Sequence, residues 1–158
     1  MKSKIKLIVL LILVGLMLLC AAFAEQLTPF DPYEQDLSQA LKAPDSTHLL
    51  GTDRYGRDML SRVIMGSRSS VFSALFLVGV ISVVGLVVGS FCGYVGGKAD
   101  AVIMRISDVF LAFPGMVFAL AVAGVLGGGI SNAVTALACI SWPKYARLAR
   151  GQVLTQKG

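Results

Sequence analysis

The side chains that most often perform chemistry are few in this chain and form no familiar catalytic pattern. His48 is the only histidine, and Cys20, Cys92 and Cys139 lie inside or at the ends of apolar stretches with no Cys-x-x-Cys spacing. The Gly-rich phosphate-binding loop, the HExxH zinc motif and the GxSxG nucleophile motif do not occur. We therefore predict no catalytic, cofactor-binding or metal site, and a protein that is not an enzyme. We expect His48 to be a solvated loop residue and the cysteines to be small packing residues.

Uncharged stretches dominate the chain, so the elements that position any functional residue are expected to lie in a membrane. The stretches 7–24, 69–97 and 109–143 contain 18, 29 and 35 residues without a charge. A hydrocarbon core of about 30 Å is crossed by roughly 20 apolar residues in a helix. The first two stretches each predict one span. The third predicts two spans, separated by a turn at residues 127–132. We predict an all-α membrane protein, a polytopic transmembrane helical bundle with four spans in this chain.

The N-terminus supports two interpretations. Lys2, Lys4 and Lys6 precede the first apolar stretch, and Ala22-Phe23-Ala24 before Glu25 resembles a signal-peptidase site. The apolar run of 18 residues is longer than the roughly 7–15 residues of a secretory signal. We therefore expect an uncleaved signal anchor. Residues 1–50 would form an N-terminal module with this helix and the start of an extracytoplasmic loop.

The charge distribution predicts the orientation. The N-terminal tail carries three lysines and no acid, and the last part of the chain is also purely basic. The loop at residues 25–68 carries five basic and seven acidic residues. Because positively charged flanks stay inside, we expect both termini in the cytoplasm of a multi-pass protein of the cell membrane. The basic residues of the C-terminal part are Lys144, Arg147, Arg150 and Lys157.

The segment 51–68 is predicted to lie at the outer interface. Apolar residues recur at helical spacing over residues 58–65, with Arg57 and Arg62 between them. This pattern predicts a short amphipathic helix before the second span, with Thr52 or Asp53 as its N-cap.

Two features inside the spans concern helix packing. Glycine recurs every four residues at Gly85, Gly89, Gly93 and Gly97, which places a surface without side chains on one helix face. That face would pack either within this chain or against a partner near a translocation path. Pro114 is predicted to kink the third span.

Charged residues at the cytoplasmic end of the third span, Arg105 and Asp108, are expected to pair with each other. No carboxylate lies in the middle of a span, which argues against an ion-coupled transporter.

Several motifs carry a family resemblance. They are a Gly-Thr-Asp-x-x-Gly-Arg-Asp element (Gly51, Thr52, Asp53, Gly56, Arg57 and Asp58), Gly-Tyr-Val-Gly-Gly-Lys-Ala-Asp at residues 93–100, and Trp-Pro-Lys-Tyr-Ala-Arg-Leu-Ala-Arg at residues 142–150. In this order the motifs resemble the C-type permease subunit of dipeptide, oligopeptide and nickel ABC importers, a bacterial inner-membrane component. The likeness covers essentially the whole chain.

The resemblance implies six spans, a homologous second permease subunit, two cytoplasmic ATPase subunits and an extracytoplasmic substrate-binding protein. Residues 69–158 would be the importer's transmembrane domain, truncated before the loop that docks on the ATPase. The implied function is half of a pathway for di- or oligopeptides, with ATP hydrolysed by the partners. A nickel permease of the same family, or a non-transporting membrane anchor or assembly protein, remains an alternative. His48 alone does not favour nickel.

Overall fold

The computed structural model describes residues 2–157, which form two compact units, one ending at Phe72 and the other beginning at Ser73. Among the described residues the regular elements are helices, and the β-type pairing is a single antiparallel bridge between Thr52 and Asp58. The all-α prediction is confirmed. The helices, in chain order, are α1 (Lys2–Ala22), α2 (Ala24–Leu27), the 3₁₀ helix η1 (Leu37–Gln39), α3 (Met59–Val95), α4 (Gly97–Ala112), α5 (Gly115–Leu126) and α6 (Ile130–Lys157).

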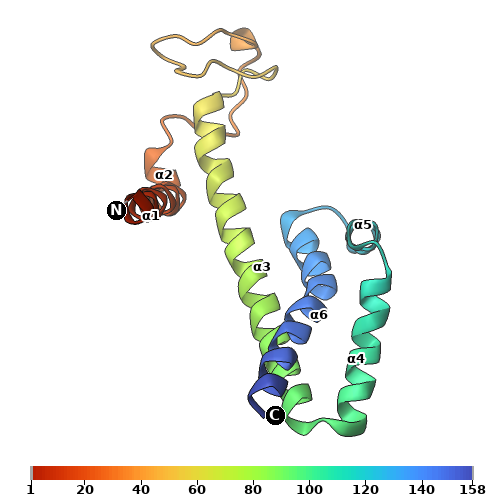
Figure 1. Cartoon of the computed structure of the whole chain (residues 1–158). Helices are drawn as coiled ribbons and strands as arrows, with labels where there is room; N and C mark the ends of the chain where they lie inside the picture. The colour runs from red at the N-terminus through yellow and green to blue at the C-terminus, as the bar shows by residue number, and fades with distance from the viewer. Residues whose placement is uncertain (1, 158) are drawn as a thin grey trace. The chain divides into compact units, whose positions relative to one another are not determined.

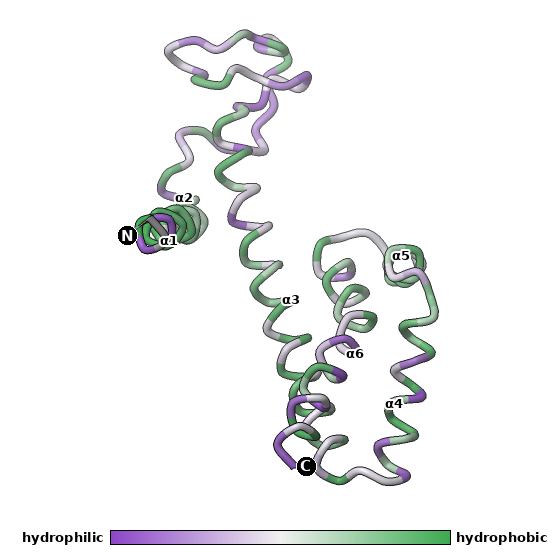
Figure 2. The backbone as a smooth tube through the Cα atoms, viewed as in Figure 1, coloured by the Kyte–Doolittle hydropathy of each residue, from purple (hydrophilic) through white to green (hydrophobic). Residues whose placement is uncertain are grey.

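Helices α1 and α3 are each long and apolar enough to cross a membrane. Most of their residues are hydrophobic, and many of these side chains are exposed. Figure 2 colours much of both helices green for hydrophobic residues. A helix whose exposed surface is apolar on all sides is stable in lipid, where its backbone groups bond internally. Among the described residues the helices that qualify number two, or up to three if the bent pair α4 and α5 counts as one span. Helix length and composition therefore give two or three crossings, fewer than the four that the sequence predicts.

The predicted third span is interrupted at Pro114 and not merely kinked there. Helix α4 ends at Ala112, α5 begins at Gly115, and the two helices meet at 89°. Phe113 has an extended backbone, with φ −86° and ψ 143°. This conformation is expected, because the proline ring disfavours the helical region for the residue before it. The break is visible in Figure 1, where α5 joins the end of α4 to the start of α6.

The predicted turn after this segment is confirmed. Helix α5 ends at Leu126 and α6 begins at Ile130. Gly127 and Gly129 have φ values of 89° and 128°, a region that favours glycine. The side-chain amide of Asn132 donates to the carbonyl oxygens of Leu126 and Gly127 at 2.8 and 3.1 Å. These bonds satisfy two carbonyl groups that the end of a helix leaves free.

The helix predicted at residues 58–65 is present from Met59, but the prediction that it is separate from the second span is wrong. Helix α3 runs without interruption from Met59 to Val95, 37 residues or about 55 Å. Gly66 lies inside it and does not break it. The N-cap is Asp58 and not Thr52 or Asp53, because Asp58 Oδ2 accepts from the backbone N–H of Ser61 at 2.7 Å.

Candidate functional site

The Gly-Thr-Asp-x-x-Gly-Arg-Asp motif folds into a tight turn around the carboxylate of Asp53. Its Oδ1 accepts from the backbone N–H groups of Tyr55 (2.8 Å) and Arg57 (3.1 Å). Its Oδ2 accepts from Arg57 Nε at 2.8 Å, and Arg57 Nη2 lies 2.7 Å away. The backbone closes the same turn, because Gly56 N–H donates to the Asp53 carbonyl at 2.9 Å. Asp53 therefore organises both the backbone and the charge of this segment.

Hydrogen bonding sets the protonation state of Asp53. Desolvation by burial alone would raise the pKa of its carboxyl group. The hydrogen bonds from the Arg57 side chain and from the Arg57 and Tyr55 N–H groups outweigh that effect and lower the pKa to about 2. Asp53 is consequently ionised at any physiological pH.

Two motif glycines allow neighbouring backbone to approach. Gly51 and Gly56 have φ values of 71° and 74°, in the left-handed region. A Cβ at Gly51 would lie 2.5 Å from the Lys42 carbonyl oxygen, and one at Gly56 would overlap the backbone of Asp36. Both glycines thus hold the segment 36–42 against the motif.

Thr52 bonds the same segment from inside the loop. Its Oγ1 accepts from the Lys42 N–H at 2.9 Å and donates to the Gln39 carbonyl oxygen. Its backbone N–H also donates to the Lys42 carbonyl at 3.1 Å. Thr52 is buried, so these bonds are shielded from water.

His48 is buried rather than solvated, which corrects the expectation from sequence. It is 7% exposed, with Nδ1 3.0 Å from Asp58 Oδ1 and Nε2 3.1 Å from Gln39 Oε1. The Phe30 ring lies 4.9 Å from the imidazole, centroid to centroid. Ser61, fully buried at the start of α3, accepts from the Phe30 N–H at 3.1 Å.

The sequence gives no local signal for these partnerships. His48 is ten residues from Asp58 and nine from Gln39, and no helix contains both members of either pair. No group of three or more His, Cys, Asp or Glu residues that could hold a metal ion occurs in the described part of the chain. The contacts that Thr52 and Asp53 make are with backbone and side chains of the loop itself.

Three of the four predicted packing glycines face α6 within the unit that begins at Ser73. A Cβ at Gly85 would overlap Tyr145 Cβ, one at Gly89 would lie 2.8 Å from Ala149 Cβ, and one at Gly93 would lie 2.8 Å from Val153 Cβ. Gly97 lies elsewhere: it is the first residue of α4, with φ 62° and open space around it. The close approach of α3 and α6 therefore depends on Gly85, Gly89 and Gly93.

Ion pairs join α4 to α6. Arg150 donates to both carboxylate oxygens of Asp100, from Nε at 2.6 Å and from Nη2 at 2.5 Å. Arg147 pairs with Asp108. The predicted pairing of Arg105 with Asp108 is therefore wrong, because the carboxylate turns to the neighbouring helix. A bidentate arginine–carboxylate pair fixes the relative orientation of two helices more strictly than a single contact.

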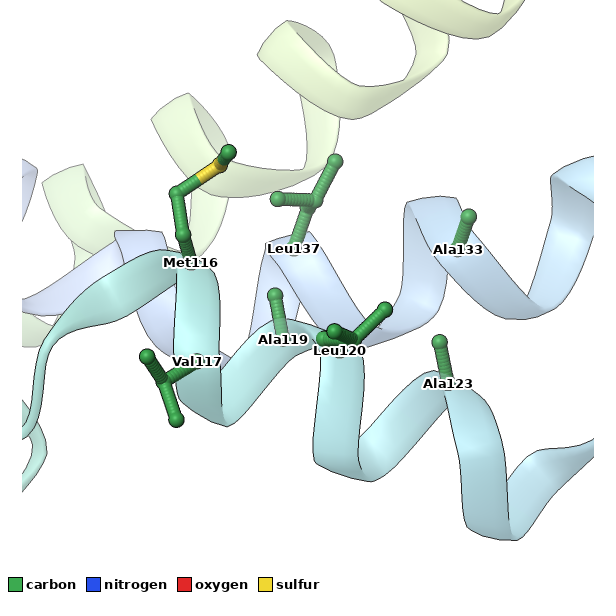
Figure 3. A pocket seen from close by; sticks show the side chains of 7 residues that line it. All are labelled: Met116, Val117, Ala119, Leu120, Ala123, Ala133 and Leu137. Carbon is green, nitrogen blue, oxygen red and sulfur yellow. The ribbon is translucent and has the colours of Figure 1, made fainter.

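Helices α5 and α6 enclose an apolar groove of about 340 Å³. Figure 3 shows side chains of both helices lining it: Met116, Val117, Ala119, Leu120 and Ala123 from α5, and Ala133 and Leu137 from α6. None of these side chains is polar, so the groove offers apolar contacts and no group that would orient a polar substrate.

Long helices with exposed apolar side chains, joined by a polar loop, are the features of a polytopic membrane protein. A family model described as "Binding-protein-dependent transport system inner membrane component" matches residues 85–157. A second model, described as "N-terminal TM domain of oligopeptide transport permease C", matches residues 7–44. The chain belongs to this family of binding-protein-dependent transport permeases, and the resemblance found in the sequence is confirmed.

Curated relatives are similar in sequence to this protein over about nine tenths of the chain. The probable D,D-dipeptide transport system permease protein of Escherichia coli (strain K12) is 42% identical over 143 residues, covering 90% of this chain and 48% of the relative. The glutathione transport system permease protein of Pectobacterium atrosepticum is 43% identical over 144 residues, covering 90% and 48%. The nickel transport system permease protein of Escherichia coli (strain K12) is 37% identical over 145 residues, covering 92% and 52%. The chain spans about half the length of the curated relatives it matches.

The ionised state of Asp53 predicts an acid limit for the loop. A carboxyl group whose pKa is lowered by folding stabilises the fold above its ordinary value of about 3.9 and loses that contribution as pH falls through its folded value. We expect hydrogen exchange of residues 53–58, corrected for the intrinsic rate, to be slow at about pH 5 and to accelerate towards pH 2. Asp53→Asn should exchange fast across this range. Asp31→Asn, which alters a carboxylate that accepts from the Tyr33 N–H in its own turn, is the control. An acid step that persists in Asp53→Asn would contradict the role of Asp53.

Enlarging a glycine at the α3–α6 contact should separate the two helices. Gly89→Leu places a side chain where Ala146 and Ala149 now lie, and overpacking of this kind costs about 1–3 kcal/mol. We expect the detergent-solubilised protein to unfold at a lower fraction of sodium dodecyl sulfate, followed by circular dichroism. Gly79→Leu is the matched control, since a Cβ there meets nothing within 4 Å. Equal effects of the two substitutions would show that the contact does not contribute to stability.

Proposed function

We propose that this protein is a membrane-spanning permease subunit of an ABC importer and forms half of a translocation pathway for di- or oligopeptides. The observation that carries the proposal is the similarity, over nine tenths of the chain, to relatives named as D,D-dipeptide and glutathione transport permeases. A dipeptide and glutathione, which is a tripeptide, are both short peptides. The spanning helices α1 and α3 supply the required membrane elements. ATP hydrolysis is assigned to two cytoplasmic partner subunits and substrate delivery to an extracytoplasmic binding protein.

The proposed mechanism is alternating access. The chain turns by 89° at Pro114 and again reverses at residues 127–129, so α5 is bounded by two breaks at which short segments can reorient. The glycine contact between α3 and α6 has few interlocking side chains, which permits helices to repack. These features support movement of rigid helices about fixed hinges.

A nickel permease is the second candidate, favoured by the 37% identity to the nickel relative. Measuring the uptake of a dipeptide and of nickel distinguishes a peptide permease from a nickel permease. In a strain that lacks this gene we expect loss of radiolabelled dipeptide uptake and normal uptake of ⁶³Ni²⁺, with dipeptide uptake restored by the wild-type gene and by Gly79→Leu but not by Gly89→Leu. Loss of nickel uptake alone would favour the second candidate. Normal uptake of both would favour a non-transporting anchor.

Affinity purification of the tagged protein should also recover a second permease and ATPase subunits.

We also propose that both termini face the cytoplasm. Lys157 at the end of α6 donates to the Tyr94 carbonyl near the end of α3 at 2.8 Å, so these two helix ends lie on the same side. The basic residues of α6, Lys144 to Lys157, belong on the cytoplasmic side by their charge. This arrangement supports an interhelical loop, residues 28–58, that faces outward.

Cysteine labelling tests the orientation. In a protein whose three cysteines are replaced by serine, we expect Ser46→Cys in the exposed interhelical loop to react with an impermeant maleimide on intact cells. Gln156→Cys, exposed near the end of α6, should react only after the cells are permeabilised. The reverse pattern would overturn the proposed orientation.

A further inference from the structure

A small pocket lies beside the first turns of α3, within the unit that ends at Phe72. Its volume is about 150 Å³, well below the roughly 300 Å³ of a pocket that encloses a whole small molecule. Part of its lining comes from the loop before α3, and the rest is spaced by three or four positions along one face of α3. The lining residues are Pro32, Tyr33, Arg62, Met65, Gly66 and Ser69. A pocket of this size fits one polar group of a larger ligand.

Arg62 is the charged residue of this pocket, and its guanidinium group has donors available. Its ion-pair partner, Asp53 Oδ2, lies 3.7 Å from Arg62 Nε, which is beyond hydrogen-bond distance. That oxygen already accepts from Arg57 Nε at 2.8 Å and lies 2.7 Å from Arg57 Nη2. A guanidinium group has five N–H donors, and this single long contact does not use them.

The local charge around Arg62 favours an anion. The ionised carboxylate of Asp53 is shared by the guanidinium groups of Arg57 and Arg62, so this cluster is positive overall. Asp31 and Glu34 belong to the same loop, but they line a different pocket, of about 250 Å³. An anion beside Arg62 would therefore meet a cation and no carboxylate among the residues that line its pocket.

The pocket lies at the border of the uncharged part of α3. Arg68 is the last charged residue before the uncharged stretch 69–97, so Ser69 marks the level at which α3 enters the hydrocarbon layer. Arg62 precedes Ser69 by seven residues, or about 10 Å along a helix. The headgroup layer on each side of a bilayer is roughly 5–8 Å thick. Because the long Arg62 side chain lines the same pocket as Ser69, it lies at the depth of the lipid headgroups.

We propose that this pocket binds the phosphate group of a membrane phospholipid. Arg62 donates charge-assisted hydrogen bonds to the phosphate oxygens, and the hydroxyl groups of Tyr33 and Ser69 are further donors. Ser69 Oγ lies 3.5 Å from the Met65 carbonyl oxygen, a long contact that a phosphate oxygen can replace. The acyl chains follow the apolar surface of α3 that begins past Ser69, where Phe72 is exposed. The inference goes beyond the proposed function, because it requires α3 in a bilayer but no particular substrate.

Gly66 keeps space open in the pocket. A Cβ at this position meets nothing within 4 Å, so a larger side chain can be added without overlap. Glycine inside a helix is less favourable than other residues by up to about 1 kcal/mol, so replacing it does not by itself weaken α3. Gly66→Leu should therefore fill the space that the phosphate needs and leave the helix intact.

Native mass spectrometry of the full chain, purified in detergent, tests the site. The protein is titrated with dioleoylphosphatidylglycerol, and the affinity for the first bound lipid is measured. We expect Arg62→Gln and Gly66→Leu each to weaken this binding by about tenfold or more, the effect of losing one charge-assisted hydrogen bond. Arg54→Gln removes the same charge from an exposed side chain of the same loop, outside the pocket, and should leave the affinity unchanged. Gly79→Leu is the matched control for Gly66→Leu.

Two further probes distinguish a lipid from a free anion. Dioleoylglycerol has the same acyl chains without the phosphate, and it should bind the wild type about tenfold more weakly or less still. Inorganic phosphate at the concentration of the lipid should not displace it, because free phosphate lacks the acyl chains that contact α3. Displacement by phosphate would overturn the lipid assignment in favour of a site for a free anion.

Three other outcomes would refute the site. They are equal binding of the two lipids, equal binding by the wild type and both pocket variants, and an equal loss of binding in Arg54→Gln. Circular dichroism shows whether each variant keeps its helices. If Arg62→Gln does not, the comparison of Gly66→Leu with Gly79→Leu decides.

Discussion

A bilayer offers no hydrogen-bond partners to the peptide backbone, so a chain that crosses it must be helical there and must satisfy the ends of its helices by other means. Within a helix the backbone satisfies itself, but the last carbonyls and the first N–H groups need other partners. Here the first turn of α3 is closed by Asp58, and the last turn of α5 is closed by the Asn132 amide. At these two helix ends a polar side chain supplies the partners that the helix itself cannot provide.

The interhelical loop and the contact between α4 and α6 use different kinds of polar interaction. In the interhelical loop, irregular backbone is stabilised by side chains such as Asp53 and Thr52 that bond to main-chain groups. Between α4 and α6 in the second unit, ion pairs join side chain to side chain, Arg150 with Asp100 and Arg147 with Asp108. The first region sets the shape of the loop, and the second sets the relative positions of α4 and α6.

Features that depend on composition or on local backbone chemistry were predictable from the sequence. The apolar helices α1 and α3 and the glycine turn before α6 follow from hydropathy and from residues tolerant of positive φ. The sequence predicted the position of the break at Pro114 but not the angle of 89° between α4 and α5, because a proline does not by itself determine that angle.

Features that depend on contacts between distant residues could not be predicted in this way. The burial of His48 requires Gln39 and Asp58 to meet across a loop, and the pairing of Asp108 with Arg147 requires α4 and α6 to be adjacent. Helical spacing favoured Arg105 as the partner of Asp108, and the packing of α6 overrode it. The family resemblance pointed to the motif residues, but it named none of the residues in segment 36–42 that they bind.

Helix α6 contacts the glycines of α3 and the carboxylates of α4, and only the glycines recur at a regular spacing. Glycine recurs every four residues along α3, so a displacement of α6 by about one helical turn, roughly 5.4 Å, would bring it to a nearly equivalent surface. The ion pairs with α4 have no such repeat, since a shift of one turn separates both arginines from their carboxylates at once. The spacing of the glycines alone would therefore specify the register of α6 less strictly than the two arginine pairs do.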